Sequence, residues 1–178
     1  TNKTEYSLSE GALPIARIAE LCQSFSMPAV GISDNNNMFG ALEFSEQIAK
    51  VGVQPILGCN IKIKTPKEYL HENIEDNDLY FYLNIFSKNN EGYENLLKCV
   101  SNAYTFNKGN AYVKVDDLIK FKDGLIILSG GNNSILTHST GHMITKQSQQ
   151  FISDFKKEFN DNFYIEIQRF GSADYRLN

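Results

Sequence analysis

Residues 29–44, AVGISDNNNMFGALEF, pass from a short apolar run into a polar loop and then into a helical pattern. The apolar residues 29–32 predict a buried strand, and the apolar spacing over 38–48 predicts a helix. A strand that leads into an acidic residue, here Asp34, is a common place for an active site. The three asparagines at 35–37 are neither acids nor bases nor good metal ligands. The loop therefore lies where an active site is common, but its asparagines lack the acid, base or metal-ligand groups that such a site needs.

Outward from this stretch, strand and helix patterns alternate along the chain. Helices are predicted over 15–25, 38–48, 93–104 and 148–159, and strands over 29–32, 55–63, 79–86, 125–128 and 163–167. The polar, acidic stretch 66–78 is expected to be an exposed insertion. This order predicts one α/β domain over 1–178 with a mainly parallel sheet, open or closed into a barrel. In such folds the chemistry gathers at the carboxyl ends of the strands, which are expected at 33–34, 59–60, 82–86, 129–132 and 168–170.

The composition is that of an ordinary globular protein, with 42% hydrophobic and 21% charged residues among 178. The net charge of −4 argues against a domain that grips nucleic acid by phosphate neutralisation alone. Cys22, Cys59 and Cys99 lie far apart within apolar runs, so we expect buried thiols of a reducing compartment. No stretch is apolar and long enough to span a bilayer. We therefore expect a cytoplasmic protein without a membrane partner.

Single motifs say little about chemistry. His138 and His142 flank a turn-like stretch, which leaves a metal-ligand role open for either. Cys59 is expected to be a buried structural thiol rather than a nucleophile. The stretch ILSGGNN, at 127–133, is compatible with a phosphate cradle made of backbone amides and equally with a tight strand-to-helix turn. On motifs alone the sequence predicts a soluble α/β domain without a recognisable active site.

The order of several longer segments along the chain is more informative than any single motif. These segments are TEYSLSEGA (4–12), MPAVGISDNNNMFGALEF (27–44), QPILGCNIKI (54–63), SKNNEGYENLLKCVSNAY (87–104), DGLIILSGG (123–131) and NFYIEIQRFG (162–171). Together they closely resemble the amino-terminal PHP (polymerase and histidinol phosphatase) domain of bacterial replicative DNA polymerase III alpha subunits. The resemblance implies a distorted (β/α)7 barrel of PHP type. Because the sequence starts at Thr1 without a methionine, we expect a fragment of a longer polymerase chain that lacks part of its first strand.

In PHP domains with an intact site, strand ends supply the ligands of up to three metal ions. The resemblance places these ligand positions at Thr1, Lys3, Glu10, Asn35, Asn60, Tyr82, Gly131, Arg169 and Phe170. Among them only Glu10 keeps a carboxylate, and Asp34 is the residual acidic residue of the site. Loss of a single outer-shell partner costs about 10- to 100-fold in metal affinity, so loss of most ligands should cost far more. We therefore expect a degenerate site with no metal, no cofactor and no catalytic residue.

The resemblance implies a structural, metal-free domain that supports the polymerase core of a DNA-directed DNA polymerase and, by family analogy, helps to dock a proofreading exonuclease subunit. The remainder of the alpha chain would be its main partner. The Mg²⁺ ions of nucleotide addition would lie in a palm outside this sequence. DNA would be bound through the parent chain rather than strongly by this domain.

Two alternatives remain open. One is a metal-dependent phosphoesterase or 3′–5′ exonuclease with an altered site, whose ligands would come from Glu10, Asp34, His138 and His142. The other is a free-standing interaction module.

The charges at the former ligand positions lead to a further hypothesis. Lys3 and Arg169 place cations where the resemblance expects metal ligands. Either side chain forms a salt bridge with Glu10 or Asp34 in place of a metal, or both point into solvent.

Overall fold

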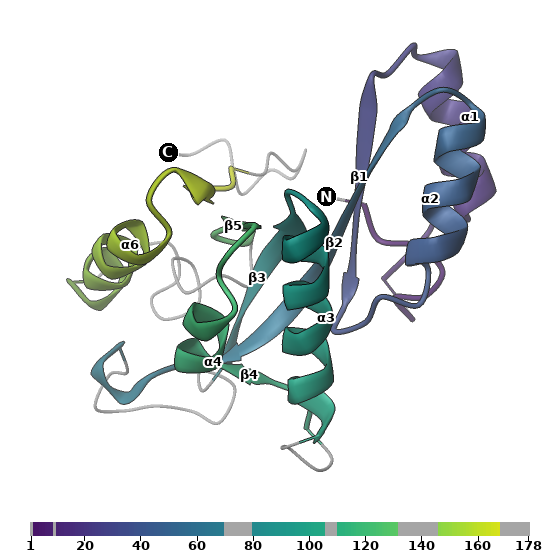
Figure 1. Cartoon of the computed structure of the whole chain (residues 1–178). Coiled ribbons are helices and arrows are strands. Elements are labelled where there is room, and N and C mark those ends of the chain that lie inside the picture. The colour runs from purple at the N-terminus through teal and green to yellow at the C-terminus, as the bar shows by residue number, and fades with distance from the viewer. Residues whose placement is uncertain (1, 9, 70–79, 106–109, 132–145, 168–178) are drawn as a thin grey trace, which may run out of the picture.

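The structure is a computed structural model, and it describes residues 2–8, 10–69, 80–105, 110–131 and 146–167. Its helices are α1 (Ile15–Ser24), α2 (Ala41–Lys50), α3 (Asn90–Thr105), α4 (Val115–Lys120) and α6 (Lys146–Phe159), with 3₁₀ turns η1 (Lys67–Tyr69) and η3 (Asn160–Asn162). Its strands are β1 (Ala29–Asn35), β2 (Gln54–Lys64), β3 (Tyr80–Ser87), β4 (Val113–Lys114), β5 (Leu125–Leu128) and β6 (Phe163–Tyr164). Figure 1 shows their arrangement. The predicted alternation of strands and helices is confirmed, and no described helix is long and apolar enough to cross a membrane.

The sheet is mixed rather than mainly parallel. Strand β1 pairs with β2, β4 with β2, and β6 with β5 in parallel, whereas β3 runs antiparallel to both β2 and β5. Lys64 at the end of β2 pairs with Tyr80 at the start of β3, so the chain returns alongside the strand it has just left. Parallel neighbours would need a crossover connection of a dozen residues or more, usually a helix. The prediction of a mainly parallel sheet was therefore wrong for β3, which is antiparallel to both of its neighbours.

The barrel expected from the resemblance is not confirmed. Across the described residues the sheet has the order β1-β2-β3-β5-β6, with β4 beside the end of β2, and no pairing joins β6 to β1. The residue Asn2 forms an isolated parallel bridge to Ile32, on the free side of β1 where the resemblance places its first strand. The architecture is therefore an open α/β sheet.

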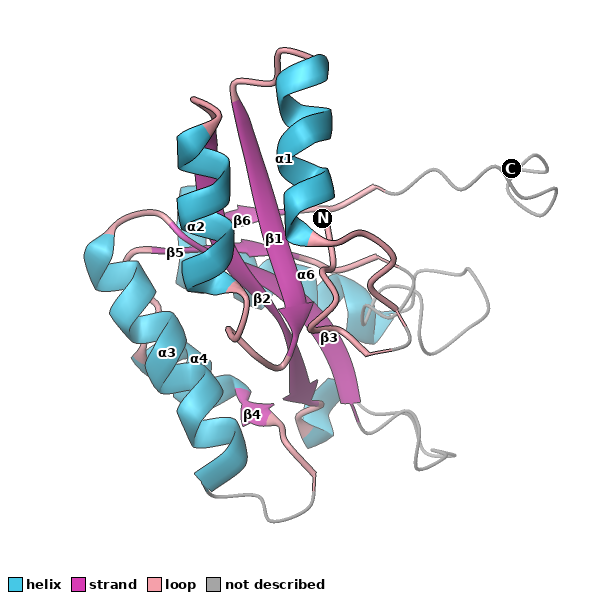
Figure 2. Ribbon diagram, turned by 90° about the vertical axis from the view of Figure 1, so that its right-hand side faces the viewer, coloured by secondary structure: helices cyan, strands magenta, loops and turns pink. Residues whose placement is uncertain are grey.

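Helices cover one face of the sheet, and two hydrophobic clusters lie beneath them. Helices α1 and α2 pack on β1 around residues such as Ile32 and Phe44. Helices α3, α4 and α6 pack on β2, β3 and β5 around Ile61, Leu83 and Phe151. Figure 2 shows α1 and α2 on either side of β1. On the opposite face, residues that alternate with these core positions carry the polar groups described below.

Two segments differ from the sequence prediction. The stretch 66–78 was expected to be an exposed insertion, yet Tyr69 is buried, stacks edge-on against Phe151 and donates its hydroxyl to Asp154 Oδ2 at 2.9 Å. Residues 70–78 lie outside the described part of the chain. The short elements β4 and α4 were not predicted, because two strand residues and six helical ones are too few for a periodicity to emerge.

The strand β1 also continues three residues beyond its predicted end, through Ser33 and Asp34 to Asn35. The register pairs Asp34 with Cys59 and Asn35 with Asn60. Because side chains alternate along a strand, Asp34 and Asn35 point to opposite faces of the sheet. This alternation decides what each residue can do.

Candidate functional site

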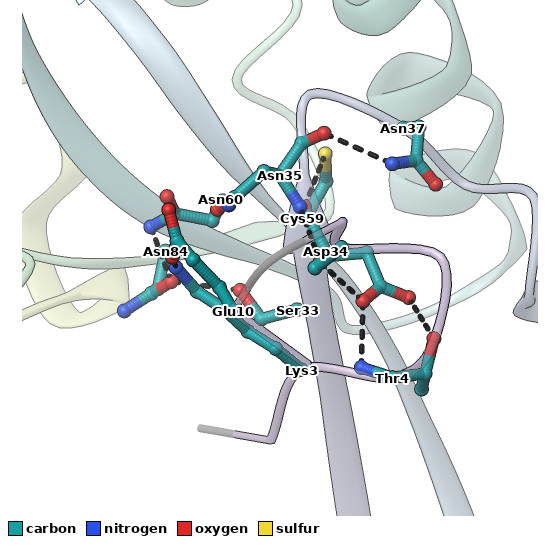
Figure 3. A network of polar contacts seen from close by, with 11 residues as sticks. Lys3, Thr4, Glu10, Ser33, Asp34, Asn35, Asn37, Cys59, Asn60 and Asn84 are labelled. Atoms are coloured by element: carbon teal, nitrogen blue, oxygen red, sulfur yellow. Dashed lines mark hydrogen bonds and ion pairs between the residues drawn. The ribbon is translucent and has the colours of Figure 1, made fainter. Parts of the chain in front are cut away.

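The candidate site lies at the carboxyl ends of β1 and β2, on the face that carries no helix among the described residues. It brings together Lys3, Glu10, Asn35 and Asn60 (Figure 3). Because β3 runs antiparallel, it contributes residues from its first half: the register pairs Tyr82 with Lys62 of β2. The carboxyl end of β3, at Phe86, lies at the other end of the sheet, contrary to the sequence expectation.

The carboxylate of Asp34 is not a free ligand of this site. Its side chain, 1% exposed, accepts hydrogen bonds from the Thr4 amide at 2.7 Å and the Ser7 hydroxyl at 2.6 Å through Oδ1, and from the Thr4 hydroxyl at 2.7 Å through Oδ2. Figure 3 shows the carboxylate turned toward Thr4, away from Asn60. Asp34 therefore fastens the N-terminal segment to β1. Its assignment as a residual acid of the metal site is corrected, because the strand's alternation turns it to the other face.

Lys3 forms the salt bridge that the sequence suggested. Its ammonium pairs with Glu10 rather than Asp34, while the side chains remain 27% and 54% exposed. The Lys3 ammonium, followed by a hydrogen bond from Asn35, lowers the pKa of Glu10 below its ordinary value. Burial and the nearby Glu10 charge raise the pKa of Tyr82. The other proposed cation, Arg169, lies outside the described residues.

Replacing Lys3 with alanine should raise the pKa of Glu10 toward its ordinary value of 4.5. The pKa of Glu10 is lower in the folded state than in the unfolded state. The ion pair therefore stabilises the fold fully above the unfolded-state pKa, and its contribution is lost as the pH falls through the folded-state pKa. The pair is too exposed to contribute more than about 1 kcal/mol. A carbon-detected NMR titration of the Glu10 carboxyl tests this, with Lys50→Ala as the control. An unchanged Glu10 pKa in the Lys3 variant would contradict the assignment.

The asparagines of the loop have divided roles. Asn36 has a positive φ of 50°, a conformation that asparagine tolerates well, and its Oδ1 accepts the amide of Lys62 at 2.8 Å. Asn37 donates to the carbonyl oxygens of Asn35 and Tyr6 at 3.0 and 3.1 Å. These two build the loop. Asn35 is the one that faces the site, and its buried Oδ1 has no hydrogen-bond partner in the described structure.

A second polar network was not foreseen from the sequence. Asn84, 3% exposed, accepts hydrogen bonds from the Ser33 hydroxyl and the Asn60 amide, each at 2.7 Å, and donates to Glu166 Oε2 at 2.7 Å. The backbone amide of Glu166 in turn donates to the Ser129 hydroxyl at 3.0 Å. The signal in the sequence was a single amide within the aromatic and apolar strand 79–86. An amide at such a position needs partners for both its oxygen and its nitrogen.

The remaining assigned positions divide into described and undescribed ones. Gly131 follows β5 and offers no side chain. Thr1, Phe170, His138 and His142 lie, like Arg169, outside the described residues. Cys59 is fully buried and donates to the Asp34 carbonyl at 3.3 Å, and burial strongly raises the pKa of its thiol. Its interpretation as a structural thiol is confirmed, and Cys22 and Cys99 are also free and buried.

The donor set of the described residues does not fit a catalytic metal. Within the described ranges, no three His, Cys, Asp or Glu side chains lie close enough together to hold a metal ion. Among the described residues, the site offers an ammonium, two amides, a phenol and the Glu10 carboxylate, which is already paired with Lys3. The nearby Glu166 carboxylate accepts a hydrogen bond from Asn84. Metals of hydrolytic sites prefer imidazole, carboxylate and thiolate ligands. We therefore derive no metal-assisted step for this arrangement.

Comparison with known proteins places this geometry in context. The family model of the PHP domain matches residues 1–170. The DNA polymerase III subunit alpha of Borreliella burgdorferi is 30% identical over 174 residues, and that of Rickettsia felis is 32% identical over 169 residues. These alignments cover 96% and 94% of this chain, but the chain spans only 15% and 13% of those relatives.

A solved structure shows the same fold. It is that of a Bifidobacterium adolescentis protein described as an inferred metal-dependent phosphoesterase, with a TM-score of 0.54 over 93% of this chain and 74% of the other. The two sequences are 11% identical, so the likeness concerns the fold alone.

Proposed function

The chain belongs to the PHP domain family, and from this premise we propose that it is a non-catalytic, metal-free PHP domain of a DNA polymerase III alpha subunit. The proposal rests most heavily on the pairing of Lys3 with Glu10. The ammonium neutralises the one carboxylate among the ligand positions, Glu10, and a divalent ion there would have to displace it and remain beside a positive charge. Like charges at such short range are unfavourable.

The surrounding contacts support a structural role. Both carboxylate oxygens of Asp34 accept hydrogen bonds from Thr4 or Ser7, and the side-chain amide of Asn60 donates to Asn84. These bonds connect the N-terminal segment to β1, and β2 to β3. Satisfied polar networks of this kind rigidify a fold. They suit a domain that supports another part of a larger protein.

The parent chain is proposed from the relatives. Proteins named DNA polymerase III subunit alpha match nearly all of this chain over a small part of their own length. We propose that nucleotide addition, with its Mg²⁺ ions, lies in the remainder of such a chain, and that this domain supports the polymerase core. By analogy with the family, we also propose that the domain helps to dock a proofreading exonuclease subunit, and we propose a cytoplasmic location.

The competing function is a metal-dependent phosphoesterase or 3′–5′ exonuclease. Its ligands would come from Glu10, Asp34, His138 and His142, and the two carboxylates are engaged by Lys3 and by Thr4. Incubation with Mn²⁺ or Zn²⁺, followed by metal analysis and by cleavage assays on a 3′-labelled oligonucleotide, separates the two functions. We expect well under one metal ion per chain and no cleavage. One tightly bound ion with cleavage would establish the enzyme.

Chelation gives an independent measurement. A metal bound only to the folded state at a hundredfold excess over its Kd adds about 2.7 kcal/mol, which is about 5 to 10 °C in Tm for a chain of this size. We expect EDTA to leave Tm unchanged. The matched comparison is the triple variant Lys3→His/Asn35→His/Asn60→Glu, which restores ligand types at three family positions and should gain metal-dependent stability. A fall in Tm of the unmodified chain with EDTA would reject the metal-free assignment.

A further inference from the structure

Three lysines and two tyrosines lie together where β2, β3 and β4 meet. The register pairs Lys64 of β2 with Lys114 of β4 on one side and with Tyr80 of β3 on the other. Lys62 precedes Lys64 by two residues and shares its face of the sheet. Tyr112 joins them through its ring, whose centroid is 5.3 Å from that of Tyr80. These five residues are called the lysine–tyrosine face, at the end of the sheet where Figure 2 shows β4 beside β2.

The rings of this face are held in place by neighbouring side chains. The Lys62 ammonium lies 4.3 Å from the centroid of the Tyr80 ring, and the Lys64 ammonium lies 5.5 Å from that of Tyr112. Lys62 also donates to Asn110 Oδ1 at 2.9 Å, and the Asn110 amide donates to the Tyr80 hydroxyl at 3.2 Å. Two half-buried aromatic rings thus each have a lysine ammonium over one face.

The lysines of the face form no ion pair with the described part of the protein. The ion pairs formed there involve Lys3, Arg17, Lys122, Lys156 and Lys157. Like charges directly opposite each other on paired strands are destabilising, and Lys64 and Lys114 are such a pair. Both also line a cavity of about 550 Å³ whose carboxylates are Glu68, Asp116, Asp154 and Glu158. None of these acids forms an ion pair with either lysine, and Asp154 and Glu158 pair with Lys157 and Lys122 instead. An anionic ligand would relieve this repulsion.

We propose that the lysine–tyrosine face binds single-stranded nucleic acid, with the lysines on phosphates and the tyrosines stacked on bases. Stacking of a base on an aromatic ring is worth about 5- to 150-fold in affinity. The cation–π contact that it would displace at an exposed site is worth about 2- to 5-fold. Exchange is therefore favourable, because the flexible lysine stems can swing the ammonium groups from the rings to the phosphates.

The position of the face suits an extended strand. Its residues run across the ends of three strands. Lys62 follows Asn60 of the candidate site by two residues on the same face of β2 and pairs with Tyr82, so the face adjoins the candidate site. An acidic peptide would pair with the lysines, but it has no bases that could stack on the two tyrosine rings. The net charge of −4 makes the binding weak. The inference needs neither a metal nor catalysis, so it holds or fails separately from the proposed function.

Fluorescence anisotropy of labelled dodecamers, one oligo(dT) and one oligo(U), tests the proposal over a range of salt concentrations. With three lysines on phosphates, the slope of log K against log salt should be about −2. The variant Lys64→Gln/Lys114→Gln should bring it to about −0.7, since two contacts are lost. The control Lys50→Gln/Lys98→Gln removes the same charge from α2 and α3 and should leave the slope near −2. Equal effects of the two double variants would overturn the proposal.

The tyrosine contribution is tested separately. Tyr80→Leu should weaken binding about tenfold, whereas Tyr80→Phe keeps the ring and should bind within about twofold of the unmodified chain. Thermal melts establish that each variant folds. Binding that is insensitive to Tyr80→Leu, or that poly-glutamate of equal charge competes for as well as unlabelled oligonucleotide, would show a simple polyanion effect and refute the inference. Preference for oligo(dT) over oligo(U), or the reverse, assigns the strand to DNA or RNA.

Discussion

Replacing Asp34 with alanine is expected to lower the free energy of unfolding by about 3 to 5 kcal/mol, since a buried donor left without its acceptor costs about 1 to 3 kcal/mol. The substitution strands the amide and hydroxyl of Thr4 and the hydroxyl of Ser7, all of which donate to this carboxylate. Asp34, Thr4 and Ser7 are all buried. Equilibrium urea denaturation measures the loss.

The matched control is Asp116→Ala, which removes an exposed carboxylate from the first turn of α4. Its effect should stay within about 1 kcal/mol, the usual size of a charge–dipole contact at a helix N-terminus. Asp34→Asn keeps the shape but replaces one acceptor with a donor, so it should fall between the two. Should Asp34→Ala prove no more harmful than Asp116→Ala, the anchoring role of Asp34 would be wrong.

Truncation of Phe151 to alanine is expected to cost about 3 to 5 kcal/mol, as for other fully buried aromatic side chains. Its ring lies within 4.0 to 5.5 Å, between centroids, of the rings of Phe155, Phe81 and Tyr69. It therefore joins α6 to both the sheet and η1. The cavity left by the ring would loosen all three contacts at once.

The same chemical change on the surface provides the comparison. Phe39, in the turn before α2, is 75% exposed, and Phe39→Ala should change the free energy of unfolding by less than about 0.5 kcal/mol. Both variants are measured by urea denaturation. A similar small effect at both positions would mean that α6 does not pack on the sheet as described.

Much of the secondary structure could be predicted from local patterns. The strand at 125–128 has its predicted limits, and the helix predicted over 15–25 is present at Ile15–Ser24. Helix α3 begins three residues earlier than its apolar spacing indicated, because Asn89 caps it by accepting the Gly92 amide at 2.8 Å. The spacing of apolar residues does not reveal a polar capping residue. Boundaries therefore depended on hydrogen bonds that periodicity does not register.

The site was predictable in its residues but not in their roles. The resemblance placed Lys3, Glu10, Asn35 and Asn60 together, and the structure brings them to one place. The charges suggested a salt bridge from Lys3 or Arg169 to Glu10 or Asp34, and the structure pairs Lys3 with Glu10. Asn84 escaped notice because nothing local distinguishes a buried hub from an isolated polar residue in a strand.

The sequence by itself determined the family, the alternation of elements and the replacement of metal-ligand types, since these are properties of residue identity and spacing. Tertiary structure decided which way each side chain faces. Strand β1 extends to Asn35, so alternation sends Asp34 to Thr4 and Asn35 to the site. The reversal of β3 then brings Asn84 opposite Asn60. Pairing direction and register depend on contacts between distant segments, and a local pattern contains no information about those partners.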